Sequence, residues 1–120
     1  QKGITSMNIN ECYQAMGADY EEVFGACSER LITKFVLKFP GDPSFSQLQS
    51  TLEEKNVEEA FRAAHTLKGV AQNLGFTPLY EHATLTEVLR AGNLPEDDNM
   101  MNAVAKEYER TVAAIEQLNA

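Results

Sequence analysis

Tryptophan is absent from this chain of 120 residues, and its two cysteines, Cys12 and Cys27, form neither a CxxC nor a CxxH pattern. The cysteines fit a reducing compartment better than a disulfide scaffold, so we expect a cytoplasmic protein. Uninterrupted apolar runs reach only three or four residues, which is too short for a transmembrane helix. No basic start followed by an apolar stretch and a small-residue cleavage site is present, so we expect no secretory signal.

Positive charge is scarce as well. Ten basic residues stand against eighteen acidic ones, which gives a formal net charge of -8 and an isoelectric point near 4.7. Such a surface repels phosphate backbones and anionic lipid headgroups, and an aromatic content of 8% leaves little for a base-stacking platform. We therefore expect no nucleic-acid partner and no membrane insertion.

The rest of the composition is that of an ordinary folded domain. Apolar residues make up 43% of the chain and charged residues 23%, which is too apolar for a disordered protein. The length allows one domain with one hydrophobic core. We expect residues 1–7 to be a flexible leader or a non-native remnant and residues 8–120 to form that domain, as a monomer.

Glycine and proline are few and clustered, which predicts long helices with short joints. Two short helices are expected first, over 8–16 and 20–25. A longer one follows from Ser28 to the Pro40–Pro43 turn, with a periodic apolar set: Leu31, Ile32, Phe35, Val36 and Phe39. Four main helices are predicted to begin near Pro43, Val57, Pro78 and Pro95. We therefore predict an all-α fold, an antiparallel up-and-down four-helix bundle with additional short N-terminal helices across one end or side.

The helix predicted over about 56–74 separates its residues onto two faces. At about 100° per residue, its apolar residues cluster on one side: Val57, Ala60, Ala64, Leu67, Ala71 and Leu74. His65 falls on the polar side, among Arg62, Lys68, Gly69 and Gln72. The projection therefore predicts an exposed histidine rather than one satisfied inside the core.

The residues around His65 suit the acceptance of a phosphoryl group. A neutral imidazole is a good nucleophile near neutral pH, because one of its ring nitrogens stays unprotonated. Lys68, one turn further on, can place its ammonium near phosphoryl oxygens. Gly69 stands beside His65 and leaves space for an incoming protein, although a mid-helix glycine costs about 1 kcal/mol relative to alanine. The alternative is that Gly69 only lets two helices approach closely.

The run Ala64-His65-Thr66-Leu67-Lys68-Gly69, followed by Ala71, Leu74 and Gly75, resembles the signature of histidine-containing phosphotransfer (HPt) domains. The resemblance extends over about 19–118 in the number, order and approximate lengths of the helices. Val70 is a departure, because the family often has serine or alanine there. Since Val70 lies away from His65 in projection, we expect this departure to alter packing more than chemistry.

HPt domains are four-helix bundles with an exposed histidine on the second bundle helix. The resemblance implies that His65 accepts a phosphoryl group, through its distal ring nitrogen, from the phospho-aspartate of a response-regulator receiver domain and passes it to another receiver. It also implies that Lys68 stabilises the phosphoryl group and that the receiver docks on an apolar patch around the histidine, with candidate contacts at Gly69, Arg62, Gln72 and Phe61. No cofactor and no kinase activity of its own are implied. Magnesium belongs to the receiver, and a hybrid histidine kinase is a further candidate partner.

Two other functions stay open from the sequence. One is an HPt-like input module of a chemotaxis-type kinase, phosphorylated by an ATP-binding domain elsewhere. The other is a helical module that binds a receiver without transferring phosphate, although the presence of both His65 and Lys68 argues against it. The other candidate side chains have plainer interpretations as surface, packing or helix-flank residues: His82, Cys12, Cys27, Met100 and Met101.

Overall fold

The computed structural model describes residues 7–25, 28–81 and 84–118. These residues form a short 3-10 helix, η2 (Phe39–Gly41), and the α-helices α1 (Ile9–Met16), α2 (Tyr20–Phe24), α3 (Glu29–Lys38), α4 (Ser44–Glu53), α5 (Val57–Leu74), α6 (Thr77–Glu81), α7 (Thr84–Arg90) and α8 (Asn99–Glu116). The predicted all-α helical bundle is confirmed. No helix in the described part of the chain is long and apolar enough to cross a membrane.

Several helix ends follow local signals in the sequence. At the starts of α1, α2, α3 and α5, the side chain of the preceding residue accepts a hydrogen bond from a backbone N–H of the first turn; these residues are Asn8, Asp19, Ser28 and Asn56. At the ends of α1 and α5, Gly17 and Gly75 adopt left-handed φ angles of 90° and 71°. A residue without a Cβ adopts this conformation at little cost, so the chain can turn sharply there.

The last helix begins later than predicted. We placed its start near Pro95, but α8 begins at Asn99, because residues 94–98 form a loop. Asp97 holds this loop: its Oδ1 accepts a hydrogen bond from the Asn99 N–H at 2.9 Å, and its Oδ2 accepts one from Asn99 Nδ2 at 3.3 Å. The third main helix was predicted to begin near Pro78, and the described residues of this stretch belong to two helices, α6 and α7. Residues 82 and 83, between them, lie outside the described residues.

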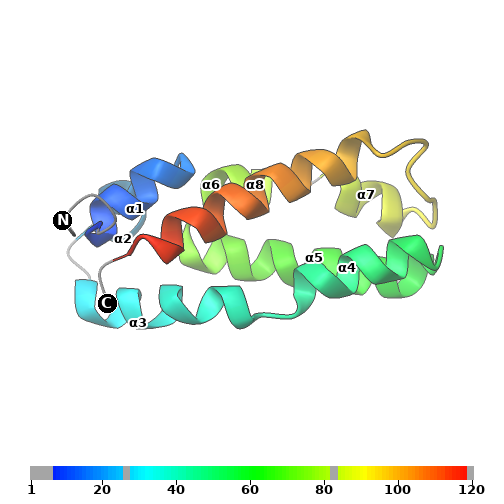
Figure 1. Cartoon of the computed structure of the whole chain (residues 1–120). Helices are drawn as coiled ribbons and strands as arrows, with labels where there is room; N and C mark the ends of the chain where they lie inside the picture. Colours follow the sequence, from blue (N-terminus) through cyan, green and yellow to red (C-terminus); the bar gives the residue numbers. More distant parts are fainter. Residues whose placement is uncertain (1–6, 26–27, 82–83, 119–120) are drawn as a thin grey trace.

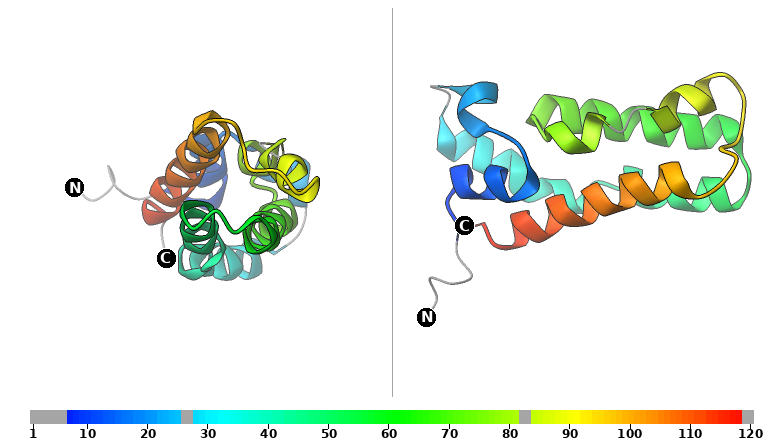
Figure 2. Two further views of the ribbon diagram at one scale, coloured as in Figure 1. Left: turned by 90° about the vertical axis from the view of Figure 1, so that its right-hand side faces the viewer. Right: turned by 90° about the horizontal axis from the view of Figure 1, so that it is seen from above.

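The bundle consists of α4, α5, the pair α6 and α7, and α8, and successive members run in alternating directions along its length (Figure 1). Helix α4 packs along α5, α5 packs against α6 and α7, and both of these contact α8. Seen from the end, α8 therefore lies diagonally across the bundle from α5 (Figure 2). The outer face of α5 is left uncovered by α8.

The short helices α1 and α2 pack at the end of the bundle where the chain begins and ends (Figure 1). Helix α1 lies against α8. Met7, which we assigned to the leader, is half-buried here, and its N–H donates a hydrogen bond to the Gln117 carbonyl at 2.6 Å. Residues 1–6 lie outside the described part of the chain.

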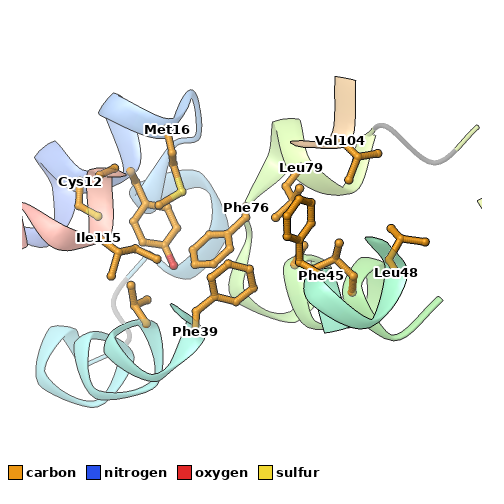
Figure 3. Packing of buried hydrophobic residues seen from close by; sticks show 14 of the residues in the cluster. Cys12, Met16, Phe39, Phe45, Leu48, Phe76, Leu79, Val104 and Ile115 are labelled. Atoms are coloured by element: carbon orange, nitrogen blue, oxygen red, sulfur yellow. The ribbon is translucent and has the colours of Figure 1, made fainter. Parts of the chain in front are cut away.

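Aromatic rings fill the core at this end (Figure 3). Neighbouring ring centroids lie 5.1 to 6.1 Å apart within a cluster that joins α1, α2, η2 and the short connection between α5 and α6: Tyr13, Tyr20, Phe24, Phe39 and Phe76. Further along the bundle, Phe45 of α4 stacks on Tyr108 of α8 with centroids 3.9 Å apart. Helix α5 contributes mainly small buried side chains to this interior, which lets its neighbours approach closely: Ala60, Ala63, Ala64 and Ala71.

Tyr13 also ties α1 to the end of α5. Its buried hydroxyl donates a 2.6 Å hydrogen bond to the Leu74 carbonyl, one of the terminal carbonyls that no intrahelical N–H reaches. We expect Tyr13→Phe to lower the free energy of unfolding by about 1–2 kcal/mol, because that carbonyl loses its partner. Urea denaturation measures this loss. Tyr80→Phe, at a half-buried ring, is the matched control; equal stability of the two variants would contradict the assigned role of the hydroxyl.

Candidate functional site

Helix α5 positions the candidate site on its outer face. Asn56 caps the helix, and Glu58 and Glu59 lie in its first turn, where carboxylates complement the helix dipole. The buried residues of α5 share the opposite side: Ala60, Ala63, Ala64, Leu67 and Ala71. His65 projects from the outer face and is exposed to solvent. The prediction of an exposed histidine on this helix is therefore confirmed.

The imidazole of His65 lies against an aromatic ring of the same helix. Phe61, one turn earlier and half-buried, has its ring centroid 5.6 Å from that of His65, with 10° between the two planes. From α7, the guanidinium carbon of Arg90 lies 5.1 Å from the Phe61 centroid. Arg90 was not among the predicted site residues, and nothing local in the sequence places it beside α5.

Lys68 and Gly69 form the next turn of the same face. Both are half-buried, and Lys68 forms no ion pair with any carboxylate in the described part of the chain. A Cβ built on Gly69 meets nothing within 4 Å beyond its own stretch of helix. The alternative that Gly69 serves the close packing of two helices is therefore wrong for the described residues. The space beside His65 is open.

Arg62 and Gln72, the other polar residues predicted around His65, are both exposed. The Arg62 guanidinium pairs with Glu58 at 3.8 Å and with Glu59 at 3.1 Å. Such exposed ion pairs contribute about 0–1 kcal/mol of stability, but they draw this cation toward the start of α5. In a chain of net charge -8, three basic residues border the face of His65: Arg62 and Lys68 on α5 and Arg90 on α7. Arg90, like Arg62, is paired with a glutamate of its own helix, Glu87, at 3.2 Å.

An apolar groove borders α5 beyond Gly69. It has a volume of about 470 Å³, and its apolar lining comes from α2, α3, η2 and the end of α5: Phe24, Ile32, Phe35, Phe39, Val70 and Leu74. On α3, Leu31 is 51% exposed and Phe35 47% exposed, whereas Ile32 is buried. The periodic apolar set predicted for this helix is therefore wider than its buried stripe. The spacing of four between Leu31 and Phe35, beside that stripe, is the sequence signal for a second apolar face.

The remaining candidate side chains do not join this site. Cys12 is a buried free thiol, and desolvation by burial raises its pKa to about 11, so the thiol stays protonated at neutral pH. Met100 and Met101 pack half-buried against the core. His82 and Cys27 lie outside the described residues. Among the residues that the structure describes, no three His, Cys, Asp or Glu side chains are grouped so that they could hold a metal ion.

A helical bundle that presents a histidine on the outer face of one member, with a lysine and an unobstructed glycine in the next turn, has the arrangement expected of a histidine phosphotransfer module. The family model of the Hpt domain matches residues 41–117, well over half of the chain, and the chain belongs to this family. Hpt domains act in histidine phosphotransfer in two-component signalling and interact with receiver domains and kinases. No curated protein and no solved structure matches this chain.

Proposed function

We propose that this Hpt domain is a phosphorelay intermediate in which His65 accepts a phosphoryl group from the phospho-aspartate of one receiver domain and passes it to another. The observation that carries the proposal is the exposure of His65 on the outer face of α5, beside the open space at Gly69. The position of both residues within the matched range 41–117 supports it.

The accepting step needs a neutral imidazole with its proton on Nδ1. The lone pair of Nε2 attacks phosphorus and forms the P–N bond, while the P–O bond to the aspartyl carboxyl breaks and its electron pair leaves on the carboxylate. The donating step reverses these events on the second receiver. Because phosphoryl transfer passes through a loose transition state, the protein contributes mainly positioning and charge stabilisation.

The receiver docks over the face of α5 that carries His65 and Gly69. Phe61 offers apolar surface one turn before the histidine, and the groove lined by Val70 and Phe35 offers more beyond Gly69. Burial of apolar surface is the main favourable contribution to such an association. Within this proposal the domain acts as a monomer that binds one receiver at a time.

The proposal is tested by incubating the chain with a panel of receivers that carry labelled phospho-aspartate. We expect label on this chain that is acid-labile and base-stable, as phosphohistidine is. Receiver binding with no label transferred from any receiver would instead favour the module that binds without transferring. Labelling only by an ATP-binding kinase domain, with no exchange with receivers, would favour the chemotaxis-type input module.

We expect Lys68→Ala to slow transfer from the receiver by about tenfold, because a positioned ammonium stabilises charge that develops on the phosphoryl oxygens. Lys68→Arg keeps the charge and should retain most of the rate. Stability should change by less than about 0.5 kcal/mol, since the substitution is at the surface. Lys106→Ala, at an exposed lysine of α8 across the bundle, is the matched control. If Lys68→Ala transferred at the wild-type rate, Lys68 would have no role in phosphoryl transfer.

A further inference from the structure

The stack of Phe61 and His65 gives the exposed imidazole a fixed neighbour. The two rings are parallel within 10° and their centroids are 5.6 Å apart, which is the geometry of an offset stack. Phe61 is half-buried at the edge of the core, whereas His65 is exposed. The phenyl ring is thus the anchored member of the pair, and the orientation of the imidazole depends on where that ring lies.

Arg90 fixes the phenyl ring from a different helix. Its guanidinium carbon is 5.1 Å from the Phe61 centroid, within the range of a cation–π contact. The guanidinium is itself oriented by two hydrogen bonds to Glu87, from Nε to Oε1 at 3.2 Å and from Nη2 to Oε2 at 3.5 Å. Helices α5 and α7 pack against each other, and this packing brings Arg90 of α7 to Phe61 of α5. A chain of contacts therefore runs from Glu87 through Arg90 and Phe61 to His65.

We infer that Arg90 is a positioning residue for phosphoryl transfer: it holds Phe61 in place, and Phe61 in turn holds the His65 imidazole in the orientation that presents Nε2 to the receiver. This inference rests on the proposed role of His65. An exposed histidine otherwise samples several staggered rotamers, and in-line attack on phosphorus requires only one of them. Ordering the ring before docking removes that entropic cost from the transfer step.

The inference predicts a particular split in the kinetics of transfer from a saturating phospho-receiver. Arg90→Ala should lower the maximal transfer rate by about two- to fivefold, the size expected of an exposed cation–π contact, and leave the half-saturating receiver concentration unchanged. Arg90→Lys, which keeps a cation near the ring, should recover part of the rate. Lys106→Ala removes the same charge from α8 and should transfer like wild type.

A double-mutant cycle separates an action through Phe61 from a direct one. We expect Phe61→Leu to lower the maximal rate by a similar factor, and Arg90→Ala to cause no further loss in the Phe61→Leu background. An equal loss in both backgrounds would show that Arg90 acts on the receiver or the phosphoryl group directly, and would overturn the inference. A raised half-saturating receiver concentration at unchanged maximal rate in the single variant Arg90→Ala would also overturn the inference, because that is the effect of losing a docking contact.

The ring orientation can be measured without any receiver. In NMR spectra of the isolated chain, we expect the side-chain couplings of His65 to report one dominant χ1 rotamer in wild type and averaging among rotamers in Arg90→Ala. Unchanged couplings in Arg90→Ala would overturn the inference even if transfer by the wild-type chain is observed. If no receiver transfers phosphate to the wild-type chain, the proposed function fails, whereas a change in the couplings would still demonstrate the chain of contacts.

Discussion

The His65→Gln variant is expected to accept no base-stable phosphate from a phosphorylated receiver, with transfer at least about three orders of magnitude slower than in wild type. A glutamine amide has similar reach and polarity but no nitrogen lone pair comparable to that of imidazole. Because His65 is exposed, its replacement should leave helicity and thermal melting close to native. Titration of the unphosphorylated receiver should give a dissociation constant within a few-fold of wild type.

The chain offers a matched control for this experiment in its second histidine. His82→Gln removes an imidazole from the same chain and should accept phosphate at the wild-type rate. Transfer measured from one labelled receiver to wild type and both variants, with circular dichroism on each, completes the comparison. Acceptance of base-stable phosphate by His65→Gln would place the acceptor on another residue.

The second large effect is expected at Gly69, where the nucleophile stays in place but access to it is lost. Gly69→Arg puts a long cationic side chain into the open space beside His65 and should weaken receiver binding by about two orders of magnitude. The protein should still fold, because a Cβ at this position meets nothing within 4 Å beyond its own stretch of helix, and arginine favours a helix more than glycine does. Calorimetric titration of the receiver measures the loss.

Two further variants show whether the bulk of the side chain at position 69 is what weakens receiver binding. Gly69→Ala adds only a methyl group, so it should bind the receiver nearly as wild type does and gain up to about 1 kcal/mol in unfolding free energy. Asn102→Arg adds the same arginine at an exposed position of α8, across the bundle, and should bind normally. Normal binding and transfer by Gly69→Arg would mean that the receiver approaches another face.

The position of His65 was predictable from the sequence because everything that determines it is local. Asn56 and Gly75 mark the ends of α5, and the spacing of small apolar residues between them identifies the buried side. A projection of one helix then places His65 on the outside and Phe61 at the margin. The same locality explains why the short helices after Asn8 and Asp19 were predicted close to their observed bounds.

The contact of Arg90 with Phe61 could not be predicted in this way. The two residues lie on different helices, and their approach depends on the rotation of α7 against α5, which tertiary packing determines. The start of α8 was missed for a different reason. The sequence offers two ordinary helix starts here, one with Pro95 at the first helical position and one with a capping side chain closer to Asn99. The structure has the later start, and it is accompanied by the two hydrogen bonds from Asn99 to Asp97.

The exposed apolar residues of α3 show a third limit. Leu31 and Phe35 fit the helical period that predicts burial, but burial requires a neighbouring element over that face. Instead, Phe35 borders the groove beside α5. Periodicity identifies which residues share a face; it does not say whether this chain or a partner covers that face.

The most direct test of His65 as the phosphoryl acceptor is to identify the atom that is bonded to phosphorus. The chain, labelled with ¹⁵N in its histidine rings, is phosphorylated by a phospho-receiver, and coupling between ³¹P and ring ¹⁵N is measured by NMR. The account predicts one phosphorylated ring, that of His65, with phosphorus bonded to Nε2. Phosphorus bonded to His82, to Nδ1 of His65 or to a residue other than histidine would contradict it.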